Sequence, residues 1–137
     1  MKATIIKILT PPSGDTDEVP GWIAPGTNDT LAVDIRFEAD LSAIPPQHAK
    51  WYITHLPTGY RVGHGDYTRA GYRDDAVNIA KRFYEAATEI GCDLTSAESS
   101  DVVGPIGKLD KDARTKFWCR VAGWPDLSAP PSGRDAE

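Results

Sequence analysis

YRDDAVNIAKRFYEAATEIG, residues 72–91, carries the strongest helical pattern in the chain. Apolar residues recur there at helical spacing and form one stripe, made of Ala76, Ile79, Ala80, Phe83, Ala87 and Ile90. Asp74 or Asp75 is expected to cap the start, where acids complement the helix dipole, and Gly91 is expected to end the helix. The pattern predicts an amphipathic helix over residues 74–90 that packs on one face of a sheet.

Just before this helix lies WYITHLPTGYRVGHG, residues 51–65, which has the pattern of two strands joined by a tight turn. Pro57 suits the second position of a type I turn, and Gly59 suits the left-handed position that follows it. This turn predicts one face with Tyr52, Thr54, Leu56, Tyr60, Val62 and His64, and an opposite face with Trp51, Ile53, His55, Arg61 and Gly63. Because the first face carries more apolar groups, we expect it to cover the helix and to leave Trp51, His55 and Arg61 exposed.

Towards the N-terminus, two further strands are predicted. Residues 3–9 form the first, and residues 10–30, which are rich in proline and glycine, predict a long loop. LAVDIRFEADL, residues 31–41, alternates apolar and charged residues, which is typical of an antiparallel strand with one buried and one solvated face. Asp34 is among the residues expected on the solvated face.

Towards the C-terminus, residues 92–108 contain Gly and Pro breakers and predict an irregular segment. Residues 110–122 predict a second helix, capped by Asp110 and ended by Gly123, with Phe117 and Val121 among its inward-facing residues. A strand is the rival interpretation, because Phe117, Cys119 and Val121 also alternate. Residues 125–137 are rich in Pro and Ser and predict a disordered tail.

The predicted architecture is α+β: a four-stranded, mostly antiparallel sheet with one amphipathic helix on one face and a second, C-terminal helix. The chain has 137 residues, which fits a single domain over residues 1–124. No run of about 20 apolar residues could span a membrane, so we expect a soluble, cytoplasmic protein. Cys92 and Cys119 have no zinc-ligand spacing and are expected to be free, buried thiols.

The net charge of -5 is unevenly distributed along the chain. Residues 49–83 hold six Lys/Arg against three Asp/Glu, whereas the segments on both sides are acidic. An acidic protein is a poor general binder of duplex DNA, because phosphate repels it at long range. The charge favours a basic protein surface as partner, including one that normally binds nucleic acid.

The residues for catalysis or metal binding are few. The three histidines are His48, His55 and His64, and the last two are predicted on opposite faces of the hairpin, so a shared metal is not expected. The sequence has no GxSxG elbow, and VVGPIGK, residues 102–108, lacks the Ser or Thr that a phosphate loop needs after its Lys. We therefore predict no catalytic residue, no metal, no cofactor and no enzymatic activity.

Aromatic and basic residues alternate in the middle segment. This mixture is typical of protein interfaces, where Trp, Tyr and Arg dominate, and also of single-stranded nucleic acid sites. A third interpretation is that Trp51 and Tyr52 are ordinary strand residues. The predicted binding residues are Trp51, His55, Arg61, Arg69 and Arg73.

WYITHLPTGYRVG followed by RDDAVNIAKRFYEAA resembles segments of small orphan proteins carried by phages, plasmids and other mobile elements. The resemblance covers about residues 50–90 and brings no catalytic residues with it. It implies a non-enzymatic inhibitor of host defence, of the anti-CRISPR type, that masks a site on a host protein or ribonucleoprotein complex. The alternative is a nucleic-acid-binding accessory protein that uses the basic hairpin, and neither function involves a membrane.

Overall fold

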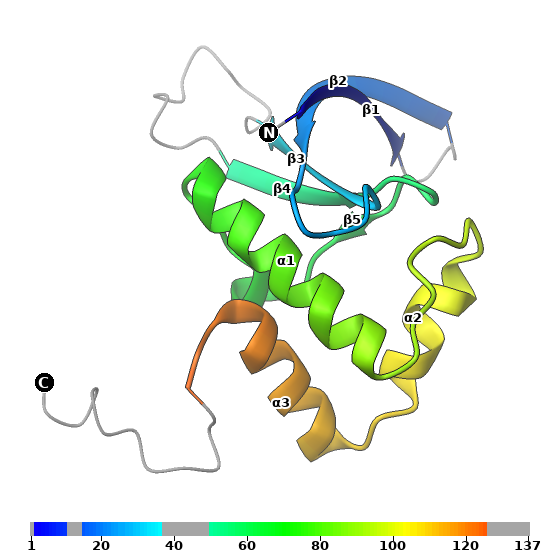
Figure 1. The fold of residues 1–137 in the computed structure, drawn as a ribbon, viewed down its shortest axis with the longest axis vertical. Helices are drawn as coiled ribbons and strands as arrows, with labels where there is room; N and C mark the ends of the chain where they lie inside the picture. The colour runs from blue at the N-terminus through cyan, green and yellow to red at the C-terminus, as the bar shows by residue number, and fades with distance from the viewer. Residues whose placement is uncertain (1, 11–14, 37–49, 126–137) are drawn as a thin grey trace, which may run out of the picture.

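The computed structural model describes residues 2–10, 15–36 and 50–125 (Figure 1). A five-stranded antiparallel sheet is followed along the chain by three α-helices, and the strands lie in the sheet in chain order. The strands are β1 (Lys2–Thr10), β2 (Asp15–Ile23), β3 (Leu31–Arg36), β4 (Lys50–His55) and β5 (Arg61–Val62). The helices are the 3-10 helix η2 (Gly65–Thr68), then α1 (Arg73–Glu89), α2 (Ser99–Gly107) and α3 (Lys111–Ala122). The predicted α+β class is confirmed, with one more strand and one more α-helix than expected.

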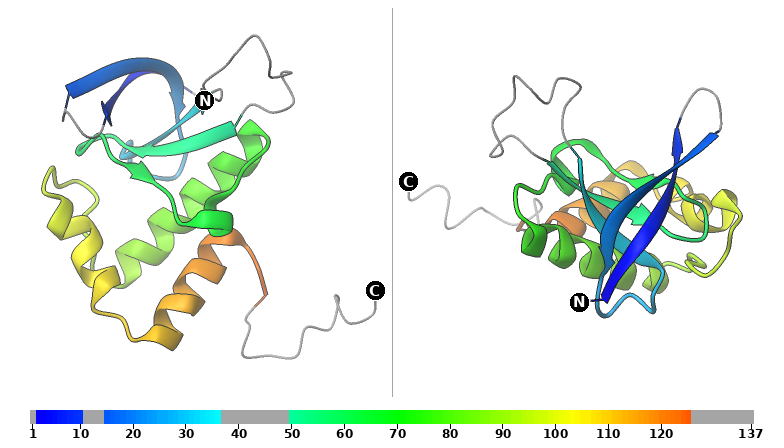
Figure 2. Two further views of the ribbon diagram at one scale, coloured as in Figure 1. Left: turned by 180° about the vertical axis from the view of Figure 1, so that it is seen from behind. Right: turned by 90° about the horizontal axis from the view of Figure 1, so that it is seen from above.

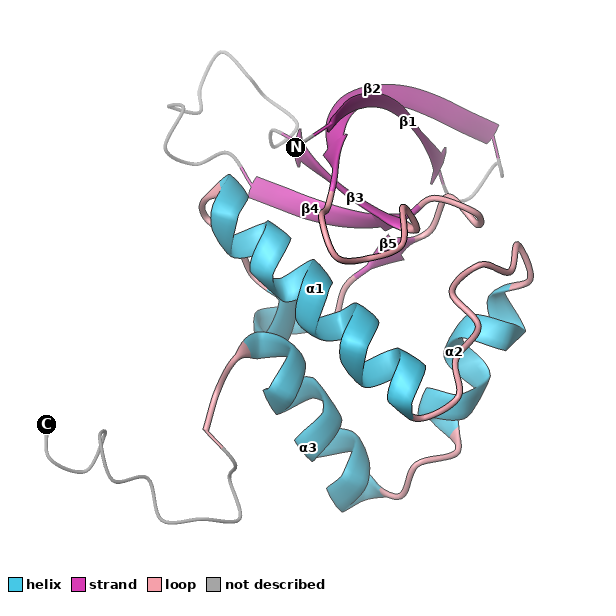
Figure 3. Cartoon of the chain, viewed as in Figure 1, coloured by secondary structure: helices cyan, strands magenta, loops and turns pink. Residues whose placement is uncertain are grey.

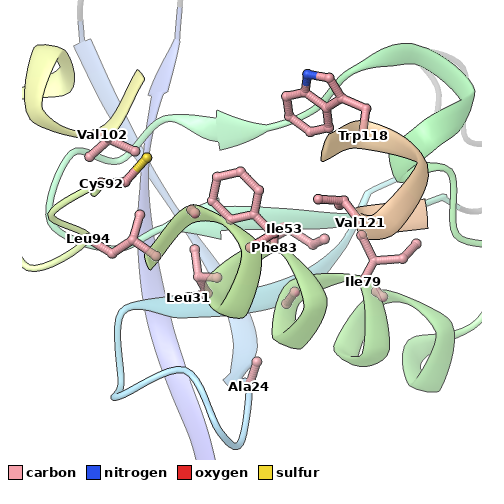
Figure 4. Close-up of a cluster of buried hydrophobic side chains, with 14 of the residues drawn as sticks. Ala24, Leu31, Ile53, Ile79, Phe83, Cys92, Leu94, Val102, Trp118 and Val121 are labelled. Atoms are coloured by element: carbon pink, nitrogen blue, oxygen red, sulfur yellow. The ribbon is translucent and has the colours of Figure 1, made fainter. Parts of the chain in front are cut away.

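The elements form layers that share two apolar clusters. Helix α1 runs beneath β3 and β4, and α3 packs against α1 (Figures 1 and 3). The larger cluster lies between the sheet and the helices, with Leu31, Val33 and Ile53 from the strands and Phe83 from α1. In the close-up, Trp118 and Val121 reach this cluster from α3, and Cys92, Leu94 and Val102 lie at its other end (Figure 4).

The prediction of α1 is confirmed. Its buried residues are Ala76, Ile79, Ala80, Phe83, Ala86 and Ala87. Gly91 follows the helix with a φ of 97°, a left-handed conformation that glycine adopts without a steric penalty. The predicted cap is wrong, because the N-cap residue is Tyr72 and the two aspartates lie in the first turn, where they still complement the helix dipole.

The prediction of an uninterrupted loop over residues 10–30 is wrong. Residues 15–23 form β2, which pairs with β1 along its full length. Pro20 lies opposite Ile5 in the part of β2 that has a neighbouring strand on one side only, which is where sheets tolerate proline. Gly21, the next residue, begins the pairing with β3 opposite Asp34, and its lack of a side chain lets β2 pass close to β3.

The prediction of a solvated face on residues 31–41 is wrong where the structure describes it, because Ala32 and Asp34 are buried on that face. The β1–β2 hairpin crosses over it (Figure 2, right), and Ile6, Ile8 and Ala32 form a second buried cluster there. Asp34 is fully buried beneath the hairpin and accepts a hydrogen bond from the Thr54 hydroxyl at 3.1 Å. Alternation indicated two faces of different polarity, but a second layer covers the polar face as well.

The hairpin between β4 and β5 differs from its predicted register by one residue. Ile53 pairs with Val62 and Thr54 pairs with Arg61, because the loop has four residues, with His55 N–H donating to the Tyr60 carbonyl at 2.9 Å. Gly59 has the predicted left-handed conformation, with a φ of 76°.

The prediction that Trp51 and His55 are exposed is wrong. Both lie on the face of β4 that carries Ile53, which is the face turned towards α1. Trp51 is half-buried and His55 is buried. Counting apolar groups could not identify the core face, because Thr54 on the opposite face of β4 is fully buried as well.

The segment predicted to be irregular contains α2, despite Gly104 and Pro105 within it. Pro105 has no N–H to donate to the carbonyl of Asp101 four residues earlier. That carbonyl accepts a hydrogen bond from the Asp93 N–H at 3.1 Å instead. The helix therefore tolerates Pro105 because a neighbouring segment satisfies the carbonyl, while Val102 and Ile106 are buried.

Helix α3 confirms the helical interpretation of residues 110–122. The Asp110 carboxylate accepts a hydrogen bond from the Ala113 N–H at 2.8 Å, and Gly123 ends the helix with a φ of 77°. Arg82 of α1 donates to the carbonyls of Val121 and Ala122 at 2.9 and 3.2 Å. This guanidinium satisfies carbonyls at the end of α3 that have no partner within the helix.

Several predictions concern residues outside those that the structure describes. They are the continuation of the third strand beyond Arg36, the position of His48 and the tail over residues 126–137.

We predict that Phe83→Ala lowers the free energy of unfolding by about 3–5 kcal/mol, because it removes a buried ring and leaves a cavity. Chemical denaturation followed by circular dichroism measures the change. Glu85→Ala, at an exposed position of the same helix, is the control and should change stability by less than about 0.5 kcal/mol. Equal effects of the two substitutions would contradict the orientation of α1.

We predict that Gly21→Ala lowers the free energy of unfolding by more than about 1 kcal/mol. A Cβ atom at Gly21 would lie 2.2 Å from Ile6 Cδ1 and 2.5 Å from the Val33 carbonyl oxygen, and the latter belongs to the backbone and cannot move aside alone. Gly71→Ala is the control, because a Cβ there meets nothing within 4 Å. A Gly21→Ala variant as stable as the wild type would show that β2 does not cross β3 this closely.

Candidate functional site

The edge of β4 that faces β5 is paired along only part of its length, and a hollow lies where the pairing stops. Strand β5 pairs with only Ile53 and Thr54, and the next contact along the edge is the Trp51 N–H donating to the Ala70 carbonyl at 3.2 Å. Between these points the chain leaves the sheet and forms η2. A hollow of about 400 Å³ results, with Trp51 and Tyr52 from β4, Arg61 from β5 and Arg69 after η2 among its lining residues.

A second hollow of about 420 Å³ adjoins the first, since Trp51 lines both. It is formed by Trp22 of β2, Trp51 of β4, and Tyr72, Arg73 and Asp74 at the start of α1. Trp22 pairs with Val33, which pairs with Ile53, so Trp22 and Trp51 belong to the core face of the sheet, at its end near the start of α1. The two indole rings lie 5.6 Å apart.

We call the surface around these hollows the Trp51 surface, and its residues are Trp22, Trp51, Tyr52, Arg61, Arg69, Tyr72 and Arg73. Two of its arginines lie over aromatic rings. The guanidinium carbon of Arg61 is 4.9 Å from the centre of the Tyr52 ring, and that of Arg73 is 5.5 Å from Trp22. Such contacts hold an arginine in place while leaving its N–H groups free to donate.

Two arginines of this surface lie next to aspartates. Arg69 lies 3.6 Å from Asp66, and Arg73 lies 3.9 Å from Asp74. All four side chains are largely exposed, so these ion pairs contribute little stability. Their effect is that positive and negative groups alternate on the Trp51 surface.

The structure brings four of the five predicted binding residues to this surface. Trp51, Arg61 and Arg69 line the first hollow, and Arg73 lines the second. His55 is absent from both. Trp22 was not predicted as a site residue because its segment was expected to form a loop. Tyr72, whose 76% exposed side chain adjoins Arg73, was not predicted either. The signal for Tyr72 was its position just before a helix whose apolar stripe does not include it.

His55 is a buried structural residue. Its Nε2 lies 2.6 Å from the Leu94 carbonyl oxygen, which can only accept, so Nε2 carries the proton. Its Nδ1 lies 2.8 Å from the Thr58 hydroxyl, which donates to it in the neutral ring. Burial lowers the pKa of His55, and the hydrogen bond to the Leu94 carbonyl offsets only part of this effect. The ring connects the hairpin to the segment between α1 and α2.

The cysteines offer little nucleophilic chemistry. Cys92 and Cys119 are free and buried, as predicted. Burial raises the pKa of the Cys92 thiol, which disfavours the reactive thiolate. In the described ranges, no three His, Cys, Asp or Glu side chains gather to hold a metal ion.

Comparisons with known proteins give no match: no family model, no curated protein and no solved structure is similar to this chain. Among the helices of the described residues, none has the length and apolar character needed to cross a membrane.

We predict that the protein loses stability as the pH falls below about 6.5, the ordinary pKa of histidine. Because the folded-state pKa of His55 is lowered, the unfolded chain takes up a proton at a higher pH than the folded chain. The contribution of this residue is therefore present above pH 6.5 and is lost between that pH and the folded-state pKa, with a slope of at most about 1.4 kcal/mol per pH unit.

Denaturation at a series of pH values between about 5 and 8 tests this prediction. His55→Gln should flatten the dependence, because a glutamine at this position can form hydrogen bonds but does not titrate. An unchanged slope in the variant would contradict the burial of a neutral His55.

Proposed function

We propose that this chain is a non-enzymatic binding protein of a mobile genetic element that masks a site on a host protein complex. The observation that supports this most directly is the Trp51 surface, where Trp51 joins two hollows lined by tryptophan, tyrosine and arginine. These three residue types are the ones that dominate binding energy at protein interfaces.

The arrangement of the side chains favours tight protein binding. Arg61 and Arg73 are each held against an aromatic ring, so fixing them on binding costs less entropy than fixing a free arginine. Tyr72 is exposed and adjoins a hollow, where it can bury its ring in a partner while its hydroxyl forms a hydrogen bond. The half-buried Trp22 and Trp51 provide a rigid apolar floor.

The charges favour a protein over a nucleic acid. Asp66 and Asp74 lie next to Arg69 and Arg73 and would repel a phosphate chain that follows the surface. The net charge of -5 adds a long-range repulsion. A protein partner with basic and acidic groups of its own can complement such an alternating pattern.

One observation favours the alternative, a nucleic-acid-binding accessory protein. Arg61 lies over Tyr52 and has no carboxylate within 4 Å among the described residues, so a base could stack beside it and a phosphate could bind it. We keep this as the second candidate.

The non-enzymatic part of the proposal is supported by the roles of the reactive side chains. Both ring nitrogens of His55 are engaged in hydrogen bonds, and both cysteines are buried. The assignment to a mobile element, and to the inhibition of host defence in the cytoplasm, is supported by the sequence resemblance over residues 50–90.

The experiment is affinity capture from a host lysate, with and without nuclease, followed by titration of the purified partner at two salt concentrations. We expect a protein that remains bound after nuclease treatment. Tyr72→Ala and Arg69→Glu should each weaken its binding by more than about 1 kcal/mol, with little salt dependence. Both residues are exposed, so the variants should fold normally.

Lys111→Glu is the matched control, since Lys111 is exposed on α3 and lines neither hollow. It should bind like the wild type. Loss of all partners after nuclease treatment, with Arg61→Gln lowering the salt slope by about one unit, would favour the nucleic-acid alternative. Binding that neither Tyr72→Ala nor Arg69→Glu affects would overturn the Trp51 surface as the site.

A further inference from the structure

A third hollow lies on the other side of β5 and has a volume of about 640 Å³. Its walls are the β4–β5 hairpin, α2 and α3, and Phe83 of α1 contributes to its floor. In the left-hand view of Figure 2, the β4–β5 hairpin lies above α2 and α3, the elements whose side chains line this hollow. We call it the Trp118 groove.

The Trp118 groove is lined mainly by apolar side chains. Phe83, Val102, Ile106 and Trp118 belong to the main core and turn their remaining accessible surface towards it. Val103, on the α2 wall, is 57% exposed. Each of these groups would lose contact with water if an apolar molecule occupied the groove.

The charged side chains of the groove are all basic. Arg61 and Arg114 line it, and no Asp or Glu is among its described lining residues. Arg114 has no carboxylate within 4 Å in the described part of the chain, and its guanidinium donates one hydrogen bond there, to the Leu109 carbonyl at 3.3 Å. Most of its N–H groups therefore remain free to bind an anion.

The imidazole of His64 also lines the groove. His64 stacks on Trp118 with a distance of 4.7 Å between ring centres, and on its other neighbour Tyr67 at 5.4 Å. Arg114 precedes Trp118 by one helical turn, so both side chains emerge from the same face of α3. The Arg114 guanidinium points towards the start of α3, where it donates to the Leu109 carbonyl, whereas the His64 ring lies at the Trp118 end of the groove.

We propose that the Trp118 groove binds a small amphipathic anion, a carboxylic acid with an apolar chain or ring. The apolar part lies against Val102, Val103 and Ile106, and the carboxylate accepts hydrogen bonds from Arg114. The volume falls within the range of about 300–1,000 Å³ that is usual for small-molecule sites. A protein partner needs a contact of about 800 Å² on each side, which favours a larger, flatter surface than this concave one.

Binding of the fluorescent anion 1-anilinonaphthalene-8-sulfonate, and its displacement by decanoate, tests this proposal. We expect saturable binding of one probe per chain. Decanoate should displace the probe about tenfold more effectively than decanol, because the alcohol has the same chain without the charge.

Variants identify the site. Arg114→Gln should weaken decanoate binding about tenfold and leave decanol unchanged. Val103→Glu places a carboxylate on an exposed position of the α2 wall and should abolish decanoate binding without unfolding the protein. Lys111→Gln, on the same helix as Arg114 but outside the groove, is the control and should bind both compounds like the wild type.

Three results would overturn the proposal. The first is equal displacement by decanoate and decanol, and the second is unchanged decanoate binding in Arg114→Gln. The third is no saturable binding of the probe or of decanoate to the wild-type protein. The test requires no knowledge of the partner at the Trp51 surface and can fail independently of it.

Discussion

The burial of Phe83 is the contact on which the layered structure depends. Its ring extends from α1 into the core shared with Ile53 of β4, and it lies 6.0 Å from the Trp118 ring and 6.1 Å from the Phe117 ring of α3. Sheet, central helix and C-terminal helix therefore meet around one side chain. The removal of apolar surface from water is the main force that holds these three elements together. The close packing around Phe83 fixes which face of each element points inward.

Buried polar contacts add the precision that apolar packing lacks. His55 connects the hairpin to Leu94, and Arg82 connects α1 to the end of α3; each contact joins segments that are far apart in sequence. The Asp93 N–H satisfies the Asp101 carbonyl that Pro105 leaves without a partner in α2. Because an unsatisfied polar group in the interior is costly, these contacts disfavour alternative packings of the same elements.

The short strand β5 organises the surface on both of its sides. By leaving β4 after two pairs, the chain creates the hollow lined by Trp51 and Arg69, and residues from Arg61 to His64 also line the Trp118 groove. The two hollows are therefore neighbours that share part of their lining. The shared residues are Arg61, Val62, Gly63 and His64.

The sequence by itself determined the elements whose residues repeat with a regular period: the apolar stripe of α1, the alternation of β3, and the capped helix α3 with Asp110 and Gly123 at its ends. It also indicated the arginines and Trp51 of the candidate site, because their composition is typical of binding surfaces. Only the tertiary structure decided that residues 15–23 form a strand, that α2 is a helix, and that Trp51 and His55 face the core. These features depend on long-range partners: β1 pairs with β2, Asp93 supports α2, and the β1–β2 hairpin buries a face of the sheet that its own residues mark as polar. A local pattern carries no information about such partners, which is why the periodic elements could be predicted and the two-sided burial of the sheet could not.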